Sequence, residues 1–368
     1  METKLWNLKN DKELAPQLEE AASILHNGGV VAFPTETVYG LGANGLNGEA
    51  CKKIFAAKGR PVDNPLILHI SEMEEILPLT SGLSPMAKKL MEAFWPGPMT
   101  LIVPKSDIIP DVVTAGLDTV AVRFPSHKIA RTFIHLAGCP VAAPSANKSG
   151  KPSPTNAADV LTDMDGIIDG VVDGGPCDIG VESTIIDTTG KEPVILRPGG
   201  ITREMIAEVM GSAELDPGLV KADETPRAPG MKYKHYAPKA PMLLIEGPEA
   251  GSAVIRTTIM AEANGLKVGV LAMEKTIAHL PKTPNIIVHS GGKTLEDLAE
   301  NLYKELREFD KEDVALIIGE GVPETQLGLA IMNRMRKSAA HNILWADEGL
   351  LRKKSGQIPA FLEMFVLQ

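Results

Sequence analysis

Short apolar runs recur along this chain and alternate with segments of helical spacing, and no other feature of the sequence restricts the fold as much. Such runs, bounded by glycine, proline or polar residues, are typical of buried strands. In the first part of the chain they lie at 30–33, 66–70, 100–103, 119–124, 141–143, 166–172, 183–187 and 194–196. Helical patterns lie near 13–27, 49–58, 84–94, 126–137 and 202–210. Strands that alternate with helices predict a mixed α/β fold.

A segment crowded with glycine, proline and charged residues interrupts this alternation at 211–240. Proline repeatedly blocks regular structure there, so we expect an interdomain linker. Beyond it, apolar runs at 242–247, 267–273, 285–290 and 314–321 and helical segments at 293–308 and 326–341 predict a smaller parallel sheet flanked by helices. A chain of 368 residues is long enough for two domains. We expect a first domain at 1–210, the linker at 211–240 and a second domain at 241–368.

Charge and composition disfavour several classes of protein. With 37 Lys and Arg against 47 Asp and Glu, the net charge of -10 argues against a broad nucleic-acid-binding face. No apolar run is long enough to cross a bilayer, and the polar N-terminus has no secretory or transit pattern. We therefore expect a soluble, cytoplasmic protein without membrane contact. Cys51, Cys139 and Cys177 are too far apart for a disulfide framework or a CxxC metal site, and we expect free thiols.

The glycines of 40–45 match the GxGxxG spelling of a dinucleotide-binding turn. That turn must follow its strand directly, whereas residues 34–39 intervene between the strand at 30–33 and Gly40, so we reject a Rossmann cofactor site. We expect these glycines to allow a tight backbone turn instead. A Walker A sequence is absent, so any nucleotide must be held by another device.

Three loop segments place small polar or cationic groups beside predicted strand ends, at 34–42, 58–66 and 143–150. The ammonium of Lys58 and the planar guanidinium of Arg60 could both contact phosphate oxygens. On its own, such a pair more often lies on the solvated surface of a protein. Ser145 and Asn147 offer a hydroxyl and an amide directly after a predicted strand, where a plain turn is an equal alternative.

Two strand residues are unusual for their apolar surroundings. Alternation within 120–124 places Arg123 on the same face as Ala121 and opposite Val122, and a cation that points inward needs an anionic partner. His69 lies in an apolar strand, where a hydrogen-bonded core histidine is the commoner case. Because no second His or Cys stands at ligand spacing, we expect no zinc site.

Four motifs together resemble the Sua5/YrdC/YwlC family of threonylcarbamoyl-AMP synthases: FPTETVYGLG at 33–42, KGRPVDNPL at 58–66, PSAN at 144–147, and VEST at 181–184 with RPG at 197–199. PGMKYKHYAP at 229–238 and GLAIMNRMRKSA at 328–339 resemble the longer, two-domain Sua5 branch, so the likeness covers essentially the whole chain. The resemblance implies an α/β fold with a YrdC-like twisted mixed sheet and helices, followed by a smaller C-terminal Rossmann-like αβα domain.

The resemblance also implies a reaction. In this family, bicarbonate or CO2 carboxylates the amine of L-threonine, and the carbamate oxygen attacks the α-phosphate of ATP and expels pyrophosphate. The enzyme is thus a nucleotidyltransferase, whose product reaches tRNA as N6-threonylcarbamoyladenosine through partner proteins. Mg2+ is implied by the ATP chemistry, although no carboxylate cluster in the sequence can be assigned to it. Catalysis of this kind needs positioning and charge neutralisation, with no covalent nucleophile.

Carried over by resemblance, the site residues form three overlapping groups. The catalytic group consists of Lys58, Arg60, Ser145 and Asn147. The threonine-binding group consists of Thr37, His69, Arg123, Ala143 and Ser183. The ATP-binding group consists of Arg60, Asn64, Thr119, Ser145, Ser153, Arg197 and Tyr236. Tyr236 would close over the nucleotide as part of a lid in the linker, and Tyr233 is the competing choice.

Two other functions stay open. An RNA-binding translation factor is one, because related single-domain proteins are associated with double-stranded RNA. The acidic balance opposes it as a main activity, but the basic stretch 221–239 could bind RNA weakly. The other is a transferase or hydrolase that uses carbamoyl phosphate on the same fold. The second domain could control a lid, dock a partner or hold a small ligand.

Overall fold

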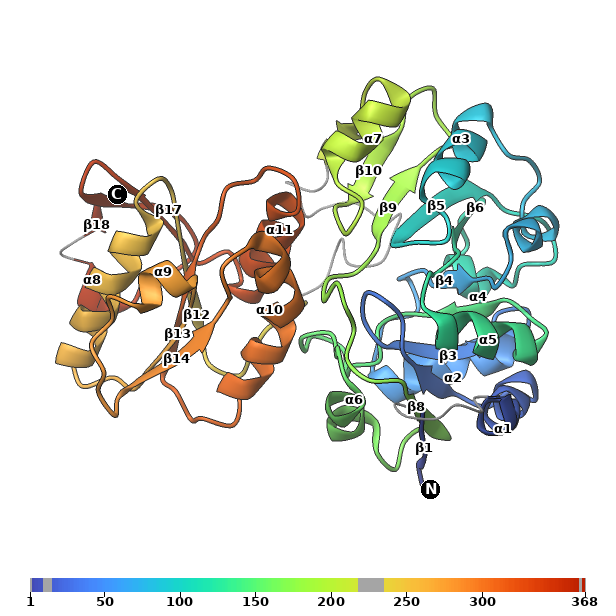
Figure 1. Ribbon diagram of the computed structural model, residues 1–368, viewed down its shortest axis with the longest axis horizontal. Coiled ribbons are helices and arrows are strands. Elements are labelled where there is room, and N and C mark those ends of the chain that lie inside the picture. The colour runs from blue at the N-terminus through green and yellow to red at the C-terminus, as the bar shows by residue number, and fades with distance from the viewer. Residues whose placement is uncertain (1, 9–14, 218–234, 364–365, 368) are drawn as a thin grey trace. The chain divides into compact units, whose positions relative to one another are not determined.

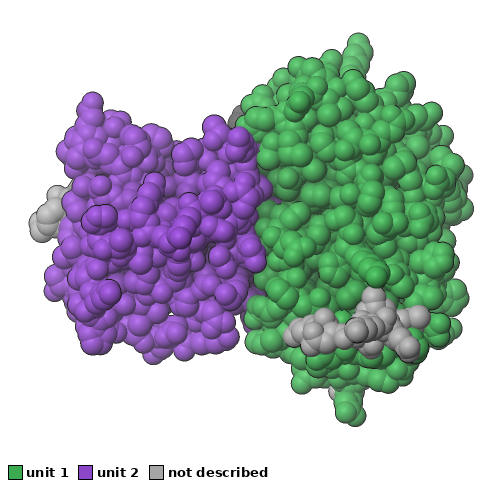
Figure 2. Space-filling model, in the orientation of Figure 1, with its two compact units in different colours: residues 1–149, 153–233 green, residues 150–152, 234–368 purple. Residues whose placement is uncertain are grey.

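The computed structural model describes residues 2–8, 15–217, 235–363 and 366–367 (Figure 1). The chain forms two compact units, one of residues 1–149 and 153–233 and the other of residues 150–152 and 234–368 (Figure 2). The first unit continues past residue 210, because the strand Glu214–Leu215 pairs with the strand before it. Most of the expected linker falls outside the described residues.

The described part of the first unit contains an eleven-stranded sheet in the order β1-β8-β2-β3-β7-β4-β6-β5-β9-β10-β11. Parallel and antiparallel pairs both occur, so the expected mixed sheet is confirmed. Its strands are β1 (Lys4–Asn7), β2 (Val31–Phe33), β3 (Gly40–Asn44), β4 (Ile67–His69), β5 (Met99–Pro104), β6 (Thr119–Arg123), β7 (Val141–Ala143), β8 (Gly170–Asp173), β9 (Thr184–Asp187), β10 (Val194–Arg197) and β11 (Glu214–Leu215).

Helices cover the two faces of this sheet unequally. They are α1 (Ala15–His26), α2 (Gly48–Lys58), α3 (Pro85–Phe94), α4 (Asp111–Thr114), α5 (Lys128–Ala137), α6 (Ala157–Met164) and α7 (Arg203–Met210), with the 3-10 helix η1 at Met73–Leu79. Apolar residues of α2, α3, α6 and α7 join Leu68, Leu101 and Val122 in the larger core. Helices α1 and α5 pack together over β2, β7 and β8 on the other face. Beyond them, the described residues form a small apolar cluster around Ile67 and Ala121 on that second face.

The glycines of 40–45 correct one expectation. Gly40 and Gly42 do not form a tight turn, because Gly40–Asn44 is the extended strand β3, which pairs with β2 and β7. Gly45 does lie in a turn, which the Asn47 amide closes by donating to the Asn44 carbonyl at 3.0 Å. A Cβ on Gly42 would lie 2.8 Å from a methyl carbon of Val141, and one on Gly45 would lie 2.5 Å from Leu68. Glycine is therefore needed for close packing between strands. The rejection of a dinucleotide-binding turn is confirmed, since a strand occupies the motif.

The second unit is a smaller sheet with helices on it, in the order β14-β13-β15-β12-β16-β17-β18. The strands β12 (Met242–Glu246), β13 (Val268–Ala272), β14 (Ile286–Ser290), β15 (Leu316–Glu320) and β16 (Ile343–Asp347) are parallel, as expected, while β17 (Leu350–Ser355) is antiparallel to β16 and pairs with β18 (Val366–Leu367). The helices are α8 (Ala250–Ala263), α9 (Glu274–Ile277), α10 (Leu295–Phe309) and α11 (Gly328–Ser338), with η3 at Ala360–Leu362. Sequence analysis missed α8, α9 and the strands β16 to β18.

A cavity of about 410 Å³ opens in the second unit where β12 and β15 end, lined by Glu246, Gly251, Glu320 and Arg336 among others. The carboxyl ends of parallel strands are where open α/β sheets hold ligands. Within the described ranges, no helix is both long and apolar enough to cross a membrane.

Candidate active site

Strand register gathers most of the predicted site residues on one face of the first sheet. His69 of β4 pairs with Arg123 of β6, and Arg123 pairs with Thr100 of β5. Ala143 of β7 pairs with Ile67, two residues before His69. Paired neighbours and residues two apart share a face of the sheet. These side chains therefore lie on the same face as α1 and α5, farther along the sheet than those two helices. The predicted alternation around Arg123 is confirmed.

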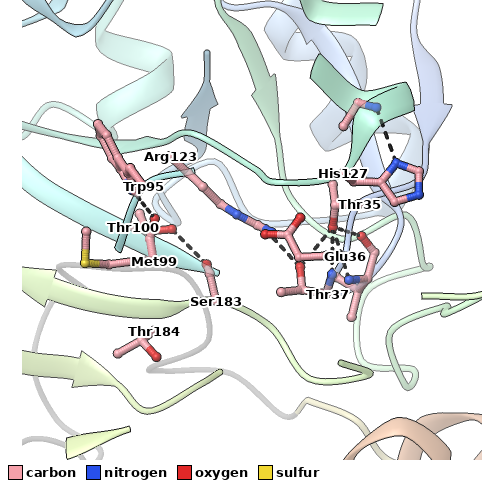
Figure 3. Close-up of polar contacts among 12 residues, drawn as sticks. Thr35, Glu36, Thr37, Trp95, Met99, Thr100, Arg123, His127, Ser183 and Thr184 are labelled. Atoms are coloured by element: carbon pink, nitrogen blue, oxygen red, sulfur yellow. Dashed lines mark hydrogen bonds and ion pairs between the residues drawn. The ribbon is translucent and has the colours of Figure 1, made fainter. Parts of the chain in front are cut away.

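The next strands extend this polar face. Ile185 of β9 pairs with Thr100, and a register shift in β10 brings Arg197 opposite Ile185. Ser183, just before β9, has its hydroxyl oxygen 2.8 Å from that of Thr100 (Figure 3). Arg197 donates from Nη2 to the same hydroxyl and from Nε to the Ser183 carbonyl, both at 3.1 Å. Arg197 and Ser183 were predicted in different groups, but they are joined directly by hydrogen bonds.

The loop between β2 and β3 faces Arg123 and is fixed by its own hydroxyl groups (Figure 3). Thr35 donates to the Val38 carbonyl over 2.6 Å, and its hydroxyl lies 2.9 Å from that of Thr37. Since Thr35 has used its one proton, Thr37 must be the donor in that pair. The Thr37 oxygen in turn accepts from Nη1 of Arg123 at 2.9 Å. This chain of hydroxyls holds the guanidinium in place.

The anionic partner that Arg123 needs is Glu36, which sequence analysis did not assign. Nη2 of Arg123 lies 2.7 Å from Oε1 of Glu36, and the two side chains are only 5% and 6% exposed. The ion pair is not aligned as a hydrogen bond, and both Glu36 oxygens and Nε of Arg123 lack hydrogen-bond partners among the described residues. Buried polar groups normally find partners, so this pair is poised for a polar ligand.

His69 is a buried, neutral histidine. Burial, followed by the charge of Arg123, lowers its pKa from 6.5 to about 3. Nδ1 lies 3.1 Å from the Ile67 carbonyl and 3.3 Å from the Val141 carbonyl, and carbonyls only accept. We therefore assign the proton to Nδ1, which leaves Nε2 as a hydrogen-bond acceptor. The ring also meets Phe33 edge to face, with centroids 5.9 Å apart.

Lys58 ties the end of α2 to the PSAN loop. The helix ends at Gly59, whose left-handed backbone (φ 61°) turns the chain toward Arg60. The Lys58 ammonium is buried and donates to the Ser145 carbonyl and, over 2.5 Å, to the Asn147 carbonyl. The Ser145 hydroxyl donates to Oδ1 of Asn147 at 2.5 Å. Of the predicted catalytic residues, these three form one contact group.

Arg60 reaches the segment that leads into β4. Its Nη2 donates to the carbonyls of Asn64 (3.3 Å) and Pro65 (3.1 Å). Asn64 is 1% exposed, and its Oδ1 lacks a hydrogen-bond partner within the described residues. Continuing the register of β4, β6 and β7 places Pro65 level with Thr119 and Ser145. Arg60, Asn64, Thr119 and Ser145 thus share one end of the face.

The face therefore has two ends, about 13 Å apart by the rise of the four-residue step from Thr119 to Arg123. Residues predicted to bind threonine, above all His69 and Arg123, lie at one end, and most of those predicted to bind ATP lie at the other. Arg197 does not lie at that end, since it is level with Thr100 and Arg123.

The strand register does not place two further predicted ATP contacts, Ser153 and Tyr236. Ser153 is fully buried and donates to Glu182 over 2.7 Å. Tyr236 belongs to the second unit, where its ring stacks on Tyr303 of α10 with centroids 5.1 Å apart. Tyr233 lies outside the described residues, so the choice between the two tyrosines stays a prediction.

Sequence analysis missed Thr35, Glu36 and Thr100. The signal for Glu36 was present, because an inward Arg123 requires an anion and Glu36 lies inside a motif already singled out. The three cysteines are free thiols, as predicted. Among the described residues, no three His, Cys, Asp or Glu side chains cluster as metal ligands would.

Comparison with known proteins matches both units. The family described as "Telomere recombination" matches residues 23–199, and the one described as "Threonylcarbamoyl-AMP synthase, C-terminal domain" matches residues 201–340. The threonylcarbamoyl-AMP synthase of Bacillus subtilis is 49% identical over 94% of this chain and 100% of its own length. That of Pyrococcus abyssi is 48% identical over 88% of this chain and 94% of its own length. The crystal structure of P. abyssi Sua5 complexed with L-threonine superposes with a TM-score of 0.89 at 46% identity, covering 94% of this chain and 100% of that one.

Proposed function

The chain belongs to the two-domain Sua5 family of threonylcarbamoyl-AMP synthases and is an enzyme, and from this premise we propose that it condenses L-threonine, bicarbonate and ATP into threonylcarbamoyl-AMP. Water and pyrophosphate are the other products. The reaction class is nucleotidyl transfer, since AMP passes from pyrophosphate to the carbamate oxygen. The observation that carries this assignment is the buried, incompletely hydrogen-bonded Arg123 on a polar sheet face.

Threonine would bind at the Arg123 end of the face. The guanidinium can take the α-carboxylate in a fork, while Thr37 fixes its orientation from behind. Neutral His69 offers Nε2 as an acceptor for the side-chain hydroxyl of threonine. Ser183, held by Arg197 and Thr100, supplies a further hydroxyl, and Ala143 a small apolar surface. This set suits a small hydroxylated amino acid.

ATP would bind with its phosphates at the other end. Arg60 brings a planar fork, and Lys58 holds a positive charge against the loop that carries Ser145 and Asn147. Charge that moves onto the leaving pyrophosphate would be neutralised there. Asn64 and Thr119 lie at the same end, and Ser153, Arg197 and Tyr236 are the remaining proposed contacts.

Mg2+ and the tRNA-modification partners belong to the proposal as well. The described residues offer no acidic cluster for a metal, so Mg2+ would arrive on the ATP phosphates, with water as its other ligands. Bound there, it would screen phosphate charge. The threonylcarbamoyl group would then pass to tRNA through partner proteins. An anhydride of this kind hydrolyses readily, so it must be kept from water until it is transferred.

Pyrophosphate release from ATP tests the proposal, with threonine and bicarbonate omitted in turn. We expect release that requires both, and a threonylcarbamoyl-adenylate detectable by mass spectrometry. Release that ignores threonine would refute it and favour an enzyme that uses carbamoyl phosphate. Salt-sensitive RNA binding without any adenylate would instead favour the RNA-binding factor.

A further inference from the structure

Glu36 is a buried carboxylate that the proposed reaction does not yet use. Its side chain is 6% exposed, and neither oxygen accepts a hydrogen bond from a described residue. Its backbone is fixed, because its carbonyl accepts from the amide of Ile179 at 2.9 Å. The free-energy cost of burying such a carboxylate is fully offset only when a ligand donates hydrogen bonds to it.

Among the described residues around Glu36, Arg123 of β6 is the one that brings a positive charge. Burial lowers the pKa of His127, the N-cap of α5, whose Nδ1 accepts from Ala130, so that ring adds no charge at neutral pH. Burial raises the pKa of the Cys177 thiol, which is likewise uncharged. Asp178 is acidic but exposed. Arg123 and Glu36 thus form a neutral pair of one cation and one anion.

We propose that Glu36 binds the α-ammonium group of threonine and accepts its proton before the amine is carboxylated. This inference rests on the proposed function. A zwitterion matches the pair charge for charge, because its carboxylate meets Arg123 while its ammonium meets Glu36. With a ligand that has a carboxylate and no ammonium, two carboxylates would share the single positive charge of Arg123. The pair therefore selects amino acids over simple hydroxy acids.

The proton step balances without any further reactant. The ammonium gives one proton to the Glu36 carboxylate and becomes the free amine. The amine nitrogen forms a bond to the carbon of bicarbonate, whose C–OH bond breaks, and the hydroxide leaves as water with the second nitrogen proton. The product carbamate carries the single negative charge that bicarbonate brought. Glu36 then releases its proton to solvent when the product leaves.

Calorimetric binding of two ligands to the full chain tests the selectivity. L-threonine and (R)-3-hydroxybutanoate differ only in the ammonium group. For the wild type we expect threonine to bind at least about 30-fold more tightly, since an unpaired buried charge is costly. In Glu36→Gln that ratio should fall to within about 3-fold, whereas Glu36→Asp should keep most of it. Asp178→Asn removes an exposed negative charge nearby and should leave the ratio unchanged.

The pH dependence of pyrophosphate release tests the proton transfer. In Glu36→Gln, release at saturating threonine should be low at neutral pH and recover as the pH approaches the pKa of the free amine, because hydroxide then removes the proton. A loss that comes only from altered structure would not recover.

The outcomes separate the two claims. A wild type that binds neither ligand overturns the proposed function and this inference with it. A wild type that prefers threonine, together with a Glu36→Gln variant that keeps the same ratio and pH profile, overturns the role of Glu36 alone.

Discussion

Each unit of the molecule contains a Glu–Arg pair whose glutamate is buried, and the two pairs are built differently. In the first unit, Glu36 and Arg123 lie 2.7 Å apart without hydrogen-bond alignment, and several of their polar atoms have no hydrogen-bond partner in the described part of the chain. In the second, Arg336 donates to both oxygens of Glu246, at 2.7 and 3.0 Å, and also to Glu324. Lys354 adds a further bond to Glu246 at 2.7 Å.

This difference separates a pair that stabilises a fold from one that serves a ligand. A fully hydrogen-bonded pair offsets the desolvation of its charges within the protein, and removing one partner leaves the other exposed to that penalty. A pair with unused donors and acceptors lacks this compensation until a ligand supplies it. Substitutions should therefore affect stability at Glu246 and activity at Arg123.

The largest expected effect is on activity, at Arg123. Arg123→Ala removes the proposed partner of the threonine carboxylate and leaves Glu36 buried beside the vacated space. We expect kcat/KM for threonine to fall by roughly 100- to 1,000-fold, as for other buried charge pairs that lose one member. Initial rates of pyrophosphate release over a range of threonine concentrations measure it. A drop of less than about 5-fold would contradict the assigned role.

The next effect is on stability, at Glu246. Glu246→Ala breaks the pair with Arg336, but Arg336 is 23% exposed and keeps Glu324, so the loss should be less than for a wholly buried pair. We expect about 2 kcal/mol of stability to be lost in the second unit. Hydrogen exchange of peptides from β12 and α11 in the full chain measures it. Unchanged exchange there would show that the network contributes little.

For each single pH unit, a smaller effect on stability is expected in the first unit, through His69. Its pKa is about 3 in the fold and 6.5 ordinarily, so below 6.5 the unfolded chain takes up a proton that the folded chain does not. The contribution of His69 to the free energy of unfolding is therefore fully present above pH 6.5. It falls by about 1.4 kcal/mol per pH unit as the pH drops from 6.5 toward about 3. His69→Gln should flatten this slope, measured by denaturant unfolding at several pH values. An equally steep slope in the variant would place its origin at another group.

The smallest expected effect is the stability of Glu36→Gln. Glu36→Gln removes the charge opposite Arg123, but the amide oxygen of Gln can still accept from the guanidinium, and no other described residue donates to Glu36, so we expect a change below about 1 kcal/mol. Hydrogen exchange of β2 and β6 peptides measures it, with Glu246→Ala as the contrasting variant. A loss as large as at Glu246 would remove the distinction between the two pairs.

Much of the fold could be predicted from the sequence because its strands and helices have strong local signals. The apolar runs became β4, β6 and β7 within a residue or two of their expected bounds. Predictions failed where local signals were ambiguous. The glycine-rich strand β3 resembled a turn in the sequence, because its glycines are required by close packing against residues distant in the chain, such as Val141. Helix α8 was missed, because it is apolar on several sides and shows little helical periodicity.

By itself, the sequence determined the family, most of the central strands and longer helices, and the need for an anion near Arg123, because these depend on residue types and short spacings. Only the tertiary structure decided that the anion is Glu36 and that His69, Arg123, Thr100 and Ser183 share one sheet face. Strand pairing joins residues far apart in the chain, and a shift of one residue in register would send each side chain to the opposite face. That choice is made by packing over the whole sheet, which no local pattern records.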